Sequence, residues 1–160
     1  MNKQLVFLGN FLQHGHTGLA WAARRDILER HGFYDACISG SGDHMMAHAM
    51  CNDFGSSCVE RLMKKDSKLL KHFINWGVPF YEDVRGKIAF TKGVVLHLWH
   101  GETTDRKYIQ RHDELRACDF DPFTDLRIGK NGAWEWNSDK PNLHKWAVEY
   151  FNERKEDGIS

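Results

Sequence analysis

The sequence predicts a mixed α/β domain, with α+β as the alternative and with more helix than strand. Three observations predict it. Apolar residues recur at helical spacing in 69–74 and 143–151, apolar runs typical of strands occur at 19–23 and 94–99, and no repeat or flexible linker divides the chain. With 160 residues, 41% apolar and 28% charged, the chain suffices for one domain, 1–160, with a buried core.

Charge and hydropathy exclude several classes of function. Lys plus Arg and Asp plus Glu both number 22, so binding to nucleic acid through bulk positive charge is not expected. The apolar stretch near the start, Leu5–Leu8, is too short to span a bilayer and lacks the long core and cleavage site of a signal peptide. We therefore expect a soluble, cytoplasmic protein without a membrane span.

The first third of the chain is predicted to form a strand and two helices. The small apolar residues Leu19–Ala23 predict a buried strand that leads into a helix ended by Gly32. A Gly/Ser loop follows at Ser39–Gly42. Asp43 then opens a second helix, which extends to about Cys51.

The middle of the chain is predicted to contain a helix and a hairpin. After a loop at 51–57, the apolar residues of 67–76 lie at helical spacing, and Gly77 and Pro79 are expected to end that helix. Lys87–Phe90 and Val94–Trp99 predict two strands joined by a short turn.

The last third is predicted to contain two helices around an irregular segment. Thr103 or Thr104 is expected to cap the first helix. Residues 119–136 are expected to be irregular, with turns at Asp121–Pro122 and Asn131–Gly132. Pro141 lies in the start signal of the last helix. The inner face of that helix is predicted to hold Leu143, Trp146, Ala147, Tyr150 and Phe151.

The first candidate for chemistry is the segment Ser39–His44, with the sequence Ser-Gly-Ser-Gly-Asp-His. Its glycines allow a sharp turn and a close approach of a ligand to the backbone, and the helix start that follows favours anions. Asp43 would there accept a proton from a bound hydroxyl as a general base. The alternative is that Asp43 only caps the helix, and the two roles are compatible.

The second candidate is the segment Leu96–Gly101, with the sequence Leu-His-Leu-Trp-His-Gly. Imidazole nitrogens are ligands for transition-metal ions. In a regular strand His97 and His100 point to opposite faces, so a bend toward Gly101 is needed to bring both to one centre.

Two further patterns are typical of metal sites but are weaker. His44 and His48 are four residues apart on one predicted helix, as in helical zinc pairs, but no Glu follows His44 as in the protease pattern. Asp119-Phe120-Asp121 is formally a DxD motif, which holds a divalent ion on a diphosphate in other proteins. A turn before Pro122 is the preferred explanation of those two acids.

Other residue groups are interpreted more plainly. Trp134-Glu135-Trp136 alternates as a strand that packs Trp on one face. Arginine forks match phosphate or carboxylate, and five arginines are candidates for such contacts: Arg24, Arg25, Arg85, Arg106 and Arg111. Four cysteines form no CxxC pair and are interpreted as reduced, small buried residues rather than zinc ligands: Cys37, Cys51, Cys58 and Cys118.

Several of these segments belong to one recognisable pattern. Its parts are residues 18–28 (GLAWAARRDIL), 31–35 (HGFYD), 38–43 (ISGSGD), 96–101 (LHLWHG), 105–108 and 120–126. Together they resemble the acceptor-side half of family 2-like GT-A glycosyltransferases, and the likeness covers roughly residues 15–158. The resemblance implies a partial GT-A-like fold.

The resemblance also implies an activity, which is transfer of a sugar from a nucleotide-sugar donor to a hydroxyl of a carbohydrate acceptor. Asp43 matches the acidic position that acts as catalytic base in the family. A divalent ion, Mn²⁺ or Mg²⁺, is implied as cofactor, with His97, or else His100, at the metal-ligand position. The candidate substrate-binding residues are Trp21, Arg24, Gly42 and His44.

The nucleotide-binding half of a GT-A enzyme, with its DxD motif, is expected to be absent from this chain. Activity would then need a separate donor-binding chain, and a homodimer is the other partner considered. Two other functions remain open. One is a non-catalytic module that binds carbohydrate or protein, and the other is a small metal-dependent hydrolase that uses His97 and His100.

Overall fold

The structure is a computed structural model that describes residues 17, 20–96, 98, 101–102 and 104–156. The chain forms two compact units, Met1–Leu96 and His97–Ser160, and each is described by itself. The described residues are mainly helical with one two-stranded sheet, so the expected mixture of helix and strand, with helix predominating, is confirmed. No helix among them has both the length and the apolar character needed to cross a bilayer.

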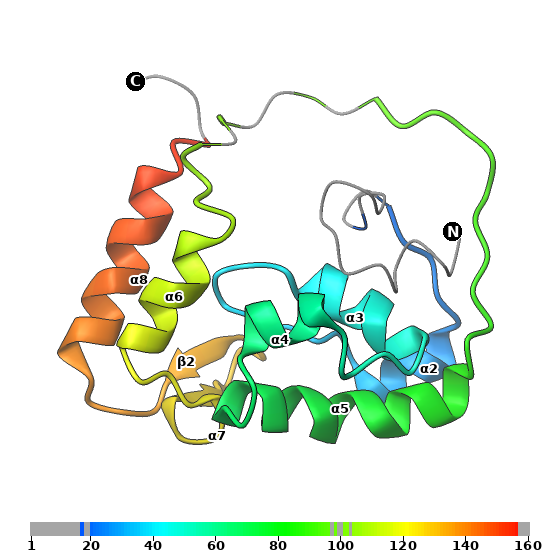
Figure 1. The fold of residues 1–160 in the computed structure, drawn as a ribbon, viewed down its shortest axis with the longest axis horizontal. Helices are drawn as coiled ribbons and strands as arrows, with labels where there is room; N and C mark the ends of the chain where they lie inside the picture. The colour runs from blue at the N-terminus through cyan, green and yellow to red at the C-terminus, as the bar shows by residue number, and fades with distance from the viewer. Residues whose placement is uncertain (1–16, 18–19, 97, 99–100, 103, 157–160) are drawn as a thin grey trace. The chain divides into compact units, whose positions relative to one another are not determined.

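The described residues of the first unit form four helices, α2 (Arg25–His31), α3 (Gly42–Met50), α4 (Ser57–Met63) and α5 (Lys68–Val84) (Figure 1). Helices α2 and α3 both pack against α5. Every residue of α3 from His44 to Ala49 is buried, so this helix is the centre of the unit. The core around it includes Tyr34, Met45, Val59, Met63, Phe73 and Phe80.

Local signals explain where these helices begin and end. The hydroxyl of Ser56 accepts the N–H of Val59 at the start of α4, and Ser67 accepts the N–H of Leu70 at the start of α5. Helix α2 ends at Gly32, which has a φ of 64°. The predicted start of α5 at Ser67 and the predicted stop at Gly32 are confirmed.

Helix α5 differs from the prediction because it continues through Gly77 and Pro79. The side of the helix at Gly77 lies against Phe54, and a Cβ added there would come within 2.6 Å of its ring. Phe80, one residue beyond Pro79, is buried in the core. The prediction that the helix ends here was wrong, because tertiary packing on both sides of the proline outweighs its local helix-breaking effect.

Two predicted strand regions are not strands in the described residues. Residues 20–23 and 87–96 form no regular secondary structure. Most apolar side chains of the second region are exposed, with Val94 86% and Leu96 88% exposed, and Ile88 is half-buried. Alternating apolar residues become a strand only when a neighbouring strand pairs with them, and none pairs with these residues in the described part of the chain.

The second unit contains α6 (Gln110–Ala117), α7 (Pro122–Asp125), β1 (Leu126–Ile128), β2 (Trp134–Trp136) and α8 (Pro141–Glu153). The two strands are antiparallel, with Leu126 opposite Trp136 and Ile128 opposite Trp134, and α8 packs against α6. The predictions of a strand at 134–136 and of the last helix are confirmed, but Phe151, which was predicted on the inner face of that helix, is 50% exposed. Residues 119–136 were predicted to be irregular, but α7 and β1 also form there.

Two details of this unit correct or support predictions. Helix α6 starts at Gln110, later than a cap at Thr104 predicts, and Thr103 lies outside the described residues. Asp121 caps α7, because its carboxylate accepts the N–H of Phe123 at 3.1 Å. This cap explains Asp121 and agrees with the preferred explanation of that residue as part of a turn before Pro122.

Candidate acceptor site and candidate metal centre

Asp43 lies in the first turn of α3, directly after the sharp turn at 38–41. Gly40 and Ser41 have positive φ values of 109° and 73°, and Ser41 is the N-cap of the helix. The interpretation of Asp43 as the cap is therefore wrong. Asp43 is half-buried and stands where its negative charge interacts favourably with the N-terminal end of the helix dipole.

Thr17 connects Asp43 to Trp21. The hydroxyl of Thr17 donates a hydrogen bond to Oδ2 of Asp43 at 3.0 Å, and the indole N–H of Trp21 donates to the backbone carbonyl of Thr17. Trp21 is 41% exposed, so part of its ring is accessible to a ligand. Asp43 lies 26 positions from Thr17 in the sequence, and Trp21 lies 4 positions from it. Thr17, which no sequence pattern indicates, therefore links two of the residues that were predicted to form the site.

Gly42 has a packing role beside Asp43. A Cβ at this position would collide with the backbone carbonyl oxygen of Tyr34. The absence of a side chain lets the start of α3 lie directly on the backbone of the preceding segment. A close approach of the chain to itself therefore explains this glycine, and its predicted contact with substrate stays a prediction.

Arg24 is not brought to Asp43 by any contact in the described residues. Its guanidinium makes two hydrogen bonds to Asp26, both 2.9 Å long, and its side chain is 80% exposed. These hydrogen bonds hold the pKa of the Asp26 carboxyl below its usual value. Binding of substrate by Arg24 stays a prediction.

The predicted metal ligands His97 and His100 both lie outside the described residues. Their convergence with Asp43 on one site, and the binding of Mn²⁺ or Mg²⁺ there, stay predictions.

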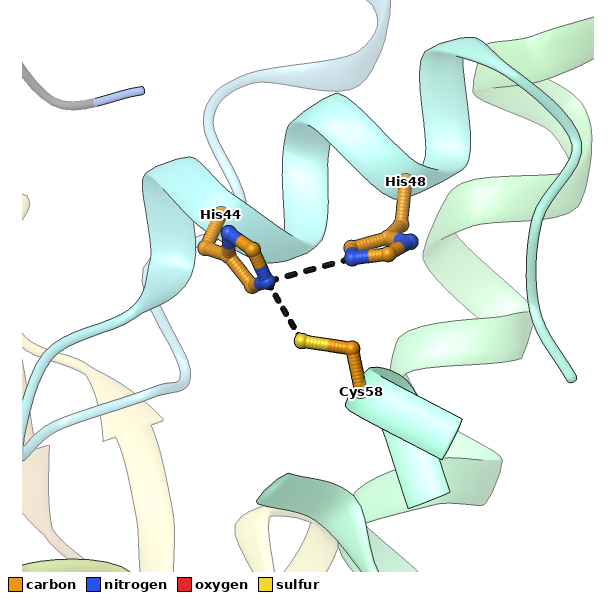
Figure 2. Close-up of side chains that lie close together, drawn as sticks. All are labelled: His44, His48 and Cys58. Atoms are coloured by element: carbon orange, nitrogen blue, oxygen red, sulfur yellow. Dashed lines mark hydrogen bonds between the residues drawn. The ribbon is translucent and has the colours of Figure 1, made fainter. Parts of the chain in front are cut away.

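A different group of potential ligands converges inside the first unit (Figure 2). His44 and His48 come from α3 and Cys58 comes from α4, and one ligand atom of each lies within 4.8 Å of the others. Nε2 of His44 lies 2.8 Å from Sγ of Cys58 and 3.1 Å from Nε2 of His48. The His44 side chain points into this buried group. Its predicted contact with substrate stays a prediction.

Two neighbouring residues orient this group. Nδ1 of His48 donates a hydrogen bond to Oδ2 of Asp53 at 2.7 Å, which leaves Nε2 of the neutral ring as an acceptor or ligand atom. Ser56 lies 3.4 Å from the same Nδ1 and caps α4, which positions Cys58 in the first turn. Burial, reinforced by the charge of Asp53, raises the pKa of the Cys58 thiol to about 11.

The His44–His48 pair is visible in the sequence, whereas the third member of the group, Cys58, is not. Two imidazoles and a thiol are a donor set suited to zinc and similar transition-metal ions, whereas Mg²⁺ prefers oxygen ligands. Cys58 follows His48 by ten residues, and nothing in that spacing indicates a contact until α4 is known to fold back on α3. A search for a cysteine within one loop of a helical His pair would have found it.

Comparison of the chain with protein-family models, with curated proteins and with solved structures yields no match.

Proposed function

We propose that this chain is the acceptor-binding portion of a GT-A-like glycosyltransferase, with Asp43 as its catalytic base. The observation that carries the proposal is the connection of Trp21 and Asp43 through Thr17. A partly exposed aromatic ring linked through one residue to a half-buried carboxylate suits a sugar, because the ring can contact the apolar face of the sugar while the carboxylate accepts a hydrogen bond from its hydroxyl. The sequence resemblance gives the same two residues the same roles.

The proposed chemistry at Asp43 is proton removal from the acceptor. Thr17 holds Oδ2, so Oδ1 would take the proton of the acceptor hydroxyl. The acceptor oxygen would form the new bond to the anomeric carbon of the donor as the bond from that carbon to phosphate breaks. The nucleoside diphosphate would leave with the electron pair. A divalent ion, Mn²⁺ or Mg²⁺ at His97 or His100, would supply positive charge for the leaving group.

The proposal is tested first by acceptor binding to the chain. The indole N–H signal of Trp21 in a spectrum of the ¹⁵N-labelled chain should shift with at least one member of a panel of oligosaccharides. Trp21→Ala should abolish that binding. Trp146→Phe is the matched control, because Trp146 is a half-buried indole hydrogen-bonded to Glu114 in the second unit, and it should leave binding unchanged.

Catalysis is tested by adding a donor-binding GT-A chain and a nucleotide-sugar, and by measuring release of nucleoside diphosphate. Asp43→Asn should lower transfer about 10²–10⁴-fold, which is the usual contribution of a positioned base, while acceptor binding is retained. Transfer that survives this substitution would contradict the assignment of Asp43. Carbohydrate binding without transfer from any donor would instead favour a non-catalytic module. If no oligosaccharide binds, or if one binds equally well to the Trp21→Ala variant, the acceptor site is wrong.

A further inference from the structure

We propose that His44, His48 and Cys58 form a binding site for one zinc-class transition-metal ion, which joins α3 to α4. The proposal rests on the geometry of these three side chains and does not depend on the transferase activity. It places the metal in the interior of the first unit, with ligands from two helices that are separated by a short loop.

The distances between the ligand atoms are close to those of a tetrahedral site. With bonds of about 2.0–2.1 Å to nitrogen and about 2.3 Å to sulfur, tetrahedral ligands lie about 3.4 Å apart for two nitrogens and about 3.6 Å apart for nitrogen and sulfur. The two Nε2 atoms are 3.1 Å apart, and Nε2 of His44 is 2.8 Å from Sγ of Cys58. Admitting an ion requires these pairs to separate by less than about 1 Å, which small side-chain rotations accomplish.

The hydrogen bond to Asp53 sets His48 in the form that a metal needs. A carboxylate accepts only, so Nδ1 of His48 carries a proton, and in the neutral ring Nε2, which lies beside Nε2 of His44, is the atom with a lone pair for a metal (Figure 2). Histidine ligands of metals commonly donate their second N–H to a carboxylate in this way. The hydrogen bond from His48 to Asp53 is thus a second observation, independent of the three clustered side chains, that indicates His48 as a metal ligand.

The three side chains of the cluster are all buried, which favours an ion that compensates their polar atoms. His48 is 0%, Cys58 3% and His44 6% exposed, so three polar groups are concentrated in the core of a small unit. Hydrogen bonds among the three side chains offset part of the cost of burying polar groups in an apolar interior. A bound dication compensates all three at once, with Cys58 binding as the thiolate after losing one proton to solvent.

The donor set also selects the ion. Imidazole and thiolate favour Zn²⁺, Co²⁺ and related ions and do not favour Mg²⁺ or Ca²⁺. Three protein ligands leave the fourth tetrahedral position to water or another small ligand. Because His44 is adjacent to Asp43 on the first turn of α3, an ion here would also fix the backbone that carries Asp43.

Cobalt is the probe that tests the site. The purified full chain is freed of metal with a chelator and titrated with Co²⁺. One equivalent should bind and produce the visible bands of tetrahedral cobalt together with a near-ultraviolet thiolate-to-cobalt band, and Zn²⁺ should remove both. Mg²⁺ should have no effect. Cobalt that binds without the thiolate band would place the ion at other histidines and overturn the proposal, as would no binding.

Single substitutions then identify the ligands. Cys58→Ser should remove the thiolate band and lower Co²⁺ affinity by more than about 100-fold, beyond the 10–100-fold cost of losing a residue that only orients a ligand. His48→Gln should weaken binding while retaining the thiolate band. Cys37→Ser is the matched control, because Cys37 is another buried, reduced cysteine outside the cluster. If Cys37→Ser removes the band and Cys58→Ser does not, the assignment is wrong. The spectrum of the wild-type chain decides the case even if a variant does not fold.

Discussion

The carboxylate of Asp53 lies 2.7 Å from Nδ1 of His48 and accepts a hydrogen bond from it, although neither the sequence spacing nor a known motif indicates that the two residues act together. This contact fixes the orientation of the ring and the nitrogen that it offers to a metal. Asp53 stands in the loop between α3 and α4, so the loop, as well as the helices, determines the shape of the proposed site.

Replacing Asp53 by Asn should therefore weaken metal binding without removing a ligand. The amide oxygen is a weaker acceptor than the carboxylate, so the ring loses orientation and basicity, and affinity for Zn²⁺ should fall about 10–100-fold. Competition with a chromophoric chelator measures the change. Asp66→Asn, the same substitution at an exposed position, should leave the affinity unaltered. Equal affinities of the wild-type and Asp53→Asn chains would show that the contact does not orient a ligand.

A second prediction concerns Pro79, which lies inside α5 and is exposed. A proline in a helix interior costs about 3 kcal/mol relative to alanine, because it lacks an N–H for the carbonyl four residues earlier. Part of this cost is offset by the restriction that proline places on the unfolded chain. Pro79→Ala should raise the free energy of unfolding of the first unit by about 1–2 kcal/mol.

Urea denaturation followed by circular dichroism measures this gain. Val78→Ala, on the same turn and 40% exposed, serves as the control and should change stability by less than about 0.5 kcal/mol. A loss of stability in the Pro79→Ala variant would mean that the ring makes contacts that outweigh its missing hydrogen bond.

The same helix shows what the sequence can and cannot predict. The start of α5 depends on a local hydrogen bond to Ser67, and the sequence shows the residue type that makes it. The apolar face of α8 depends on the periodicity of its residues, which the sequence also shows directly. The passage of α5 through Gly77 depends on the ring of Phe54, which lies more than twenty positions away. The prediction of a hairpin at 87–99 was wrong for the described residues 87–96, which form no strand. The reason is similar, because apolar alternation does not specify which strand would pair with them.

The candidate sites follow the same division. The composition of the Gly/Ser loop indicates Asp43 in the sequence. The four-residue spacing on one helix indicates the pair of His44 and His48. Thr17 and Cys58 are not, because each reaches its partner only through the fold. Local chemistry therefore predicted part of each candidate site, and tertiary contacts supplied the residues that complete it.

A third prediction uses the close approach at Gly42. A methyl group there would collide with the carbonyl oxygen of Tyr34, and a backbone atom moves aside less readily than a flexible side chain. Gly42→Ala should lower the free energy of unfolding by about 1–3 kcal/mol, as is usual for overpacking. Gly55→Ala is the matched control, since nothing lies within 4 Å of an added Cβ at that position, and it should change stability by less than about 0.5 kcal/mol. Similar effects of the two substitutions in urea denaturation would contradict the packing role of Gly42.

The last prediction concerns acid destabilisation of the second unit through His112. Burial, together with the charges of Arg111 and Arg116, lowers the pKa of His112 from 6.5 to about 4. The folded state therefore binds a proton less readily than the unfolded state. Stability from the neutral imidazole is complete above pH 6.5 and is lost as the pH falls from there toward 4. The loss should be on the order of 2 kcal/mol by pH 4.5.

His112→Gln separates this titration from the packing of the side chain. The variant should be less stable at neutral pH, but its free energy of unfolding should fall less steeply between pH 6.5 and 4.5 than that of the wild-type chain. Leu115→Ala is the control, because it removes a buried side chain from the same helix without removing a titrating group. It should lower stability by a similar amount at every pH. If the free energy of unfolding of the His112→Gln variant falls as steeply as that of the wild-type chain, other groups account for the acid sensitivity. Asp125 would then be the next residue to replace. Burial raises the pKa of its carboxyl, but hydrogen bonds from Asp121 and Lys140 outweigh burial and lower that pKa.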